Sequence, residues 1–192
     1  MPDANKAVLD FLHTRRSRPA KLLQAPAPDR DALMPILKAA VRTPDHGKLE
    51  PWRFIVLEKP ALRRIAAAVD RCGSENGRPQ EDIAKARQQF EDSPLCVAVI
   101  EVQKASEKIP AIEQTYSAGA VCLALLNAAL ASGWGANWLS GWPSHDCGFC
   151  QQTLGLSDNE RVAGFIHIGT ASAIPPDRPR PDVEALTTWL DA

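Results

Sequence analysis

Apolar and polar positions follow two periods along the chain. Apolar residues recur every three to four positions in several segments, which predicts amphipathic helices, whereas short apolar runs bounded by turn residues predict strands. The pattern predicts helices over residues 3–14, 31–41, 60–69, 81–91, 112–132 and 147–154. It predicts strands over residues 52–57, 95–102, 136–139 and 162–168. Helices placed between strands in this order favour an α+β or α/β arrangement in three layers.

Proline and glycine set several predicted boundaries. Pro35 would lie one turn inside a helix that began at Asp29, so we expect the second helix to be capped at Asp31. The polar stretch 72–80 contains two glycines and a proline and predicts a loop. The proline-rich segment 174–181 must be extended, because proline fixes φ and restrains the residue before it. This tail is better suited to wrapping over a surface than to joining two domains.

The predicted helix over residues 112–132 is apolar nearly all round and rich in Ala, Gly and Ser. Such a helix lies at the centre of a large core or in a closely packed interface, since small side chains let backbones approach. A single short domain can cover only part of it. We therefore expect a second subunit, although a two-sided core within one chain would give the same pattern.

Length and charge exclude several classes. The 192 residues fit one domain, residues 1–192, with 45% hydrophobic and 23% charged residues. Lys plus Arg number 22 and Asp plus Glu 23, a net charge of −1 that gives no basic footprint for nucleic acid. Neither nucleic-acid binding nor disorder is expected.

The chain carries no pattern typical of secretion or of a membrane span. Asp3 and Asp10 interrupt the region where a signal peptide would be apolar, and the apolar run 118–131 is broken by Asn127 and is short of the roughly 20 residues of a span. We expect a cytoplasmic protein that contacts no membrane. Its five cysteines are then free thiols by default.

The common nucleotide-binding motifs, G-x-G-x-x-G and G-x-x-x-x-G-K-[ST], are absent from the sequence. Arg15, Arg16 and Ser17 at a helix end offer guanidinium forks and a hydroxyl, which suit a phosphate. On local grounds alone, the simpler interpretation is that the cations complement the dipole of the preceding helix. A second candidate is the polar loop 42–54, which delivers His46 and Glu50 to the start of a strand.

Taken together, these segments resemble the FMN-dependent nitroreductase family, in its short bacterial branch. The resemblance rests on Arg-Arg-Ser near the N-terminus, Pro-Asp-His-Gly before Pro-Trp-x-Phe, and Ala-Asn-Trp-Leu-Ser-Gly at 136–141. It extends to Gly-Phe-Ile-His-Ile-Gly-Thr at 164–170 and to the Arg-Pro-Arg-Pro tail. It implies an α+β fold, a three-layer α/β/α sandwich that forms a homodimer with FMN at the subunit interface.

The resemblance also assigns roles to individual residues. Arg15, Arg16 and Ser17 match the segment for the FMN phosphate and ribityl chain, to which Arg178 or Arg180 adds a contact. His46 and Glu50 match a loop that reaches the flavin from the neighbouring subunit. The segment from Trp138 through Leu139 to Ser140 matches the one that lies along the isoalloxazine ring.

The implied activity is NAD(P)H-dependent reduction of nitroaromatic, quinone or related small-molecule acceptors by ping-pong hydride transfer. Since hydride transfer is the chemistry of the cofactor, no catalytic acid or base is assigned. Glu50 stands where the resemblance leads us to expect an amide, and an ionised carboxylate cannot donate a hydrogen bond to a flavin. We expect Glu50 to turn away, toward Lys48 or Arg53. Leu139 stands in place of an arginine, so a contact there must come from the backbone.

Cys147 and Cys150 form the main competing signal. A C-x-x-C at a helix N-terminus can carry out dithiol chemistry, and His145 could add a metal ligand. One pair without further Cys or His at ligand spacing does not complete a zinc site, so no metal is expected. The alternatives to the oxidoreductase are a flavin carrier without catalysis and a thiol- or metal-binding module built on these two cysteines.

Overall fold

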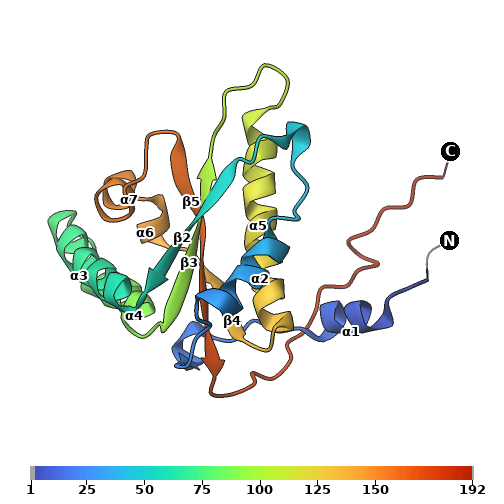
Figure 1. Cartoon of the computed structure of the whole chain (residues 1–192), viewed down its shortest axis with the longest axis horizontal. Helices are drawn as coiled ribbons and strands as arrows, with labels where there is room; N and C mark the ends of the chain where they lie inside the picture. The colour runs from blue at the N-terminus through green and yellow to red at the C-terminus, as the bar shows by residue number, and fades with distance from the viewer. Residues whose placement is uncertain (1–2, 192) are drawn as a thin grey trace.

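A five-stranded antiparallel sheet forms the centre of the molecule, as Figure 1 shows for the computed structural model, which describes residues 3–191. The strands run in the order β1-β5-β3-β2, and β4 pairs with β5. Their bounds are Leu23–Gln24 for β1, Trp52–Glu58 for β2, Leu95–Val102 for β3, Gly135–Leu139 for β4 and Glu160–Ala171 for β5. The helices are α1 (Lys6–Thr14), α2 (Arg30–Ala40), α3 (Lys59–Glu75), α4 (Gln80–Glu91), α5 (Ala111–Ala131), α6 (Trp142–His145) and α7 (Cys147–Leu154).

Helices cover both faces of the sheet. On one face, α3, α4, α6 and α7 pack over a core that includes Leu62, Phe90 and Phe165. On the other face, α2 and α5 pack over a second core that includes Ile36 and Leu125. This three-layer arrangement confirms the α+β sandwich expected from the sequence.

The central strand β3 is buried over nearly its whole length. It pairs with β2 on one side and β5 on the other, and its side chains alternate between the two cores. A strand covered on both faces needs no polar alternation, which explains its continuous apolar sequence.

The long helix α5 lies on the sheet with one side only. Val121, Cys122 and Leu125 are buried against the sheet, whereas Tyr116 and Leu123 are exposed. Among the described residues α5 alone is long and apolar enough to cross a membrane, and 44% of its apolar 18-residue stretch is buried inside the molecule. Its 21 residues exceed the run counted from the sequence, because the helix continues through Asn127 and begins before it becomes uniformly apolar.

Two boundaries of the longer helices differ from the sequence prediction. The start of α2 at Asp31 was wrong: Asp29 is the N-cap, and its side chain accepts a hydrogen bond from the Ala32 N–H, so Pro35 lies inside the helix. The loop over 72–80 was also wrong in its first half, since α3 continues to Glu75. Gly73 lets α3 approach α4, because a Cβ there would lie 2.6 Å from Ile83.

Other differences concern short elements. The first helix begins at Lys6, where the Asn5 side chain accepts from the Val8 N–H, rather than at residue 3. The one-turn helix α6 and the two-residue strand β1 were not predicted, because elements this short leave no periodic pattern.

Candidate functional site

The segment that follows α1 is fixed to the end of the sheet. Arg15 leaves the helix with extended ψ, and the chain reaches Arg18 without forming a helix or strand. The Arg18 N–H donates to the Ala136 carbonyl at 2.8 Å, and the Asn137 side chain donates to the Arg18 carbonyl at 2.7 Å. These two bonds attach the arginine-rich segment to β4.

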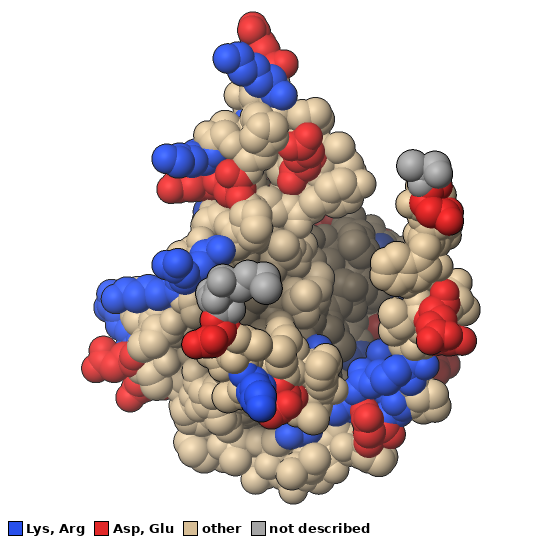
Figure 2. Space-filling model, turned by 90° about the vertical axis from the view of Figure 1, so that its right-hand side faces the viewer, with Lys and Arg blue, Asp and Glu red and all other residues tan. Residues whose placement is uncertain are grey.

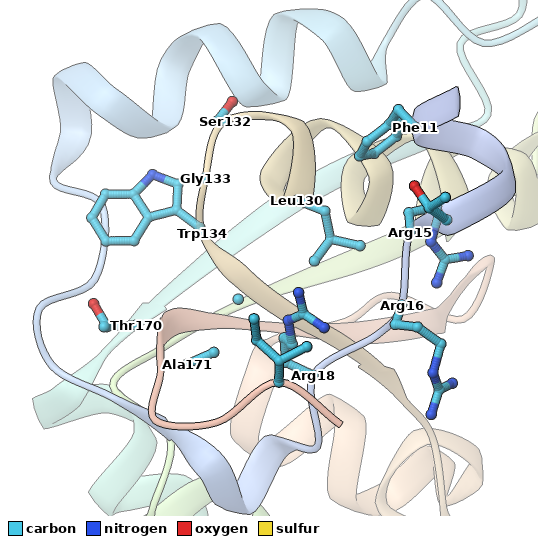
Figure 3. Close-up of a pocket in the computed structure, with 13 residues that line it drawn as sticks. Phe11, Arg15, Arg16, Arg18, Leu130, Ser132, Gly133, Trp134, Thr170 and Ala171 are labelled. Carbon is cyan, nitrogen blue, oxygen red and sulfur yellow. The ribbon is translucent and has the colours of Figure 1, made fainter. Parts of the chain in front are cut away.

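A cavity of about 620 Å³ lies beside this segment. Its walls come from the end of α1, the segment after it, the C-terminal end of α5, the start of β4 and the end of β5. Figure 3 shows the Arg18 guanidinium in the middle of this space, Arg15 and Arg16 along one wall and Trp134 on the opposite side. Thr170 and Ala171 line the floor.

The structure brings the arginines at the two ends of the sequence together. Burial lowers the pKa of the Arg15 guanidinium, and the positive charges of Arg180, Arg16 and Arg178 lower it further. Asp177 is the one carboxylate paired with this group in the described chain, 2.6 Å from Arg180 and 3.9 Å from Arg16. Four guanidinium groups with one carboxylate leave an excess of positive charge that favours an anion.

Two donors of this cluster have no hydrogen-bond partner in the part of the chain that the structure describes. The Nε atoms of Arg15 and Arg16 are buried without a hydrogen-bond acceptor, although Arg15 also donates from its terminal nitrogen to the Ser17 hydroxyl at 3.1 Å. A buried unpaired donor costs about 1–3 kcal/mol, and charged donors bind oxyanions strongly. The donors and the charge therefore suit a phosphate group.

The loop with His46 and Glu50 lies at the other end of α5. His46 Nδ1 lies 2.6 Å from a Glu113 carboxylate oxygen, in the first turn of that helix. The Asp45 carboxylate accepts from the Glu50 N–H at 2.7 Å, which holds a turn in which Gly47 and Glu50 have positive φ. The loop is thus shaped by its own hydrogen bonds and by α5.

This loop and the arginine cavity cannot contact the same small molecule within one chain. Glu113 and Leu130, which line the two places, are separated along α5 by about 25 Å at 1.5 Å per residue. The side of α5 that the sheet does not cover runs between these two places. Figure 2 views the molecule from this side, where the middle is hollowed and largely free of charged side chains.

The sequence expectation for Glu50 is corrected in part. Arg53 is not its partner, because Arg53 donates twice to the Glu160 carboxylate, at 2.6 and 2.9 Å. These bonds lower the pKa of Glu160 to about 2. The Glu50 side chain is exposed, and within residues 3–191 it forms no ion pair with Lys48 either.

Trp138, Leu139 and Ser140 lie at the end of β4 and after it. Trp138 is 37% exposed and covers Gly164 of β5, where a Cβ would lie 2.1 Å from the indole nitrogen. Gly164 thus makes room for the flat ring. Leu139 and Ser140 line a separate cavity of about 350 Å³ beside α4, so the structure does not unite them with the arginine cavity.

Cys147 and Cys150 lie at the start of α7. Cys147 is exposed and Cys150 is buried, with its thiol donating to the Pro143 carbonyl at 3.2 Å. Burial raises the pKa of Cys150 to about 12, and the charges of Cys147 and Asp146 act in the same direction. In the described part of the chain, no three His, Cys, Asp or Glu side chains are grouped to hold a metal ion.

Sequence reasoning missed most residues of the arginine cavity, among them Arg18, Trp134 and Thr170. The position of Arg18 two residues after Arg16 was an available signal, because alternate side chains of an extended segment point to the same side. Nothing in the sequence placed Trp134 and Thr170 beside them, since that contact depends on the pairing of β4 with β5.

The sequence of this chain is similar to that of known proteins. The model of the nitroreductase family matches residues 12–170. A relative in Escherichia coli (strain K12), provisionally named NAD(P)H nitroreductase YdjA, is 33% identical over 162 residues, which are 84% of this chain and 87% of the relative.

Solved structures share the fold over the full length. A nitroreductase-like family protein from Bacillus cereus has a TM-score of 0.82 and 21% identity, with 100% of both chains covered. A provisionally named nitroreductase from Desulfovibrio desulfuricans, solved in complex with FMN, has a TM-score of 0.76 and 20% identity, again over 100% of both chains.

The fold is that of the nitroreductase-like α+β oxidoreductases. The chain belongs to the nitroreductase family, which confirms the resemblance read from its motifs.

Proposed function

We propose that this protein is an FMN-dependent oxidoreductase that uses NAD(P)H to reduce nitroaromatic, quinone or related acceptors. The observation that carries the proposal is the cavity whose arginines gather from both ends of the chain, with two buried Nε atoms that have no hydrogen-bond acceptor among residues 3–191. Family membership and the FMN complex of a fold neighbour support the same cofactor. When bound, FMN supplies the redox chemistry, accepting a hydride from NAD(P)H and delivering it to the acceptor in a second half-reaction.

In this proposal the residues of the chain bind and orient the cofactor. Arg15, Arg16 and Ser17 hold the phosphate, with Arg18 beside them and Arg178 or Arg180 closing the site from the tail. Their donors fit three phosphate oxygens better than they fit water, because guanidinium groups bind phosphate in fixed, bidentate geometry. The end of β4 offers Trp138 and backbone N–H groups to the ring.

We propose further that the functional unit is a homodimer that buries the open side of α5. Ile112, Tyr116 and Leu123 are 46–68% exposed along one stripe of this helix, and Gly119 has open space where a side chain would be. Exposed apolar surface of this extent marks an interaction site. An antiparallel pairing of two such helices places the His46 and Glu50 loop of one chain near the arginine cavity of the other.

A shared site also accounts for the separation of the two groups of candidate residues. The turn of α5 that contacts His46 and the turn that lines the arginine cavity are about 25 Å apart along the helix within one subunit. A twofold axis through α5 brings the two ends of the helix together across the interface. In this proposal the loop of His46 and Glu50 approaches the flavin of the partner subunit, with the Glu50 carboxylate turned away from the ring; among residues 3–191 it forms no ion pair.

The spectrum of the purified protein tests the cofactor. We expect a yellow protein that absorbs at about 450 nm, contains one FMN per chain and releases the flavin on unfolding. A colourless protein that does not take up added FMN and contains stoichiometric zinc refutes the proposal in favour of a metal-binding module.

A further inference from the structure

A second cavity lies on the opposite face of the sheet from α5. It has a volume of about 420 Å³ and lies between the α6–α7 corner and the start of β5. Ser144, His145, Cys147 and Cys150 form one wall. The proposed function uses none of these residues, so this cavity is a separate feature of the molecule.

One buried polar group in this wall lacks a partner. Ser144 is 4% exposed, and its hydroxyl is buried without any hydrogen bond in the structure. A hydroxyl can donate one hydrogen bond and accept two, and leaving it unpaired costs about 1–3 kcal/mol. Because Ser144 lines the cavity, an occupant with polar groups can satisfy it.

The two cysteines differ as an attacking and a resolving thiol would. Cys147 is the first residue of α7, is exposed and lines the cavity. Cys150 lies one turn later. It is buried and protonated, and its thiol donates a hydrogen bond to the Pro143 carbonyl. Residues three apart in a helix have Cα atoms about 5 Å apart, which lies within the range for a disulfide.

The Asp146 carboxylate beside Cys147 is held by hydrogen bonds of its own. Asp146 is the N-cap of α7, and one of its oxygens accepts from the Phe149 N–H at 2.9 Å. Its other oxygen accepts from Arg78 at 3.3 Å and from Asn76 at 3.4 Å. These donors compensate the negative charge beside Cys147.

We propose that Cys147 is a thiol-modification site for low-molecular-weight disulfides, with Ser144 binding the incoming molecule in the cavity and Cys150 resolving the adduct. The Cys147 thiolate attacks one sulfur of a disulfide RSSR, forms a mixed disulfide and expels RS⁻, which takes a proton from water. Cys150 then loses its proton to solvent and attacks the Cys147 sulfur, which expels the second RS⁻. The two protein thiols are oxidised to one disulfide and RSSR is reduced to two RSH.

The exchange has a structural consequence at α6. Closing the Cys147–Cys150 disulfide removes the hydrogen bond from Cys150 to Pro143, and Pro143 belongs to the helix that begins three residues after the end of β4. The oxidised protein therefore loses one tie between α7 and α6.

Glutathione disulfide is the probe for this proposal. The reduced full-length protein is incubated with it, quenched with an alkylating reagent and mapped by peptide mass spectrometry. We expect the wild type to form the internal Cys147–Cys150 disulfide without a lasting adduct, Cys150→Ala and Cys150→Ser to accumulate glutathione on Cys147, and Cys147→Ala to form neither. The buried Cys72, Cys96 and Cys122 serve as internal controls, and they should react with the alkylating reagent only after the protein is unfolded.

Other outcomes overturn the proposal. Equal reaction at the three control cysteines, a stable adduct on Cys147 in the wild type, or no trapped adduct in either Cys150 variant contradicts the assigned roles. Ser144→Ala should slow the first step about three- to tenfold, the worth of one hydrogen bond. An unchanged rate in this variant, with unchanged melting, refutes the binding role of the cavity.

Discussion

The substitution Arg15→Met separates the charge of the arginine cavity from its packing. Methionine keeps an unbranched side chain of similar reach but removes the guanidinium, its buried unpaired Nε and its bond to Ser17. It also removes a cation that burial and Arg180, Arg16 and Arg178 all act to disfavour. The free protein therefore loses little that stabilises it, whereas a bound phosphate loses a charged donor.

The size of the effect follows from the donors involved. A hydrogen bond to a charged group contributes about 1.5–3 kcal/mol, which is roughly 10- to 150-fold in the dissociation constant for FMN. Because mutual repulsion among the arginines is relieved, the melting temperature of the FMN-free variant should equal or exceed that of the wild type. Weaker binding together with undiminished stability is the signature of a ligand-binding cation rather than a structural one.

Fluorescence titration of FMN into the FMN-free protein measures the first quantity, and thermal unfolding without FMN measures the second. Arg63→Met is the matched control, since Arg63 is exposed on α3 and has no ion pair in the described chain. An Arg15→Met variant that binds FMN as tightly as Arg63→Met refutes the phosphate role of the cavity.

Four further predictions follow. Gly164→Ala should displace the indole of Trp138 and cost about 1–3 kcal/mol in urea unfolding, and an unchanged free energy of unfolding with unchanged tryptophan fluorescence contradicts the packing. Burial lowers the pKa of His167 to about 4, so the folded residue stays neutral while its unfolded counterpart gains a proton below about pH 6.5. The free energy of unfolding should then fall by roughly 3 kcal/mol as the pH drops from about 7 to 4, and His167→Gln should remove this part of the fall. Glu50→Gln should leave FMN affinity within about twofold of the wild type, and markedly weaker binding or a lower flavin potential contradicts an outward-turned carboxylate. Leu123→Glu should convert a dimer to a folded monomer in sedimentation velocity, with FMN binding lost; a wild type that is monomeric and fully active at micromolar concentration contradicts the shared site.

Local sequence was sufficient to predict the main elements of the fold. The continuous apolar run of β3 and the long apolar stretch of α5 have their pattern in consecutive residues, so the layers could be predicted without a structure. Contacts between distant segments could not. The start of α2 is an example. Pro35 led to the prediction of a late start, but the hydrogen bond from the Ala32 N–H to the Asp29 side chain outweighs the one backbone hydrogen bond that proline removes.

In the candidate site, too, the sequence predicts individual residues but not the contacts between distant segments. Arg15 and Arg16 stand out as adjacent cations, but the convergence of Arg178 and Arg180 on them joins residues more than 160 positions apart and depends on the course of the tail. Pairing of Arg53 with Glu160 likewise joins two strands that are separated in the sheet by β3. Such pairs depend on the topology of the sheet, which a single sequence does not determine.

The most direct test of the central claim is the anaerobic reaction of the FMN-loaded protein. We expect stoichiometric NADH or NADPH to bleach the flavin absorption, and a nitroaromatic or quinone, added after the nicotinamide is consumed, to restore it with one acceptor reduced per flavin. A flavin that stays oxidised in the presence of both nicotinamides would contradict the account and make the protein a flavin carrier.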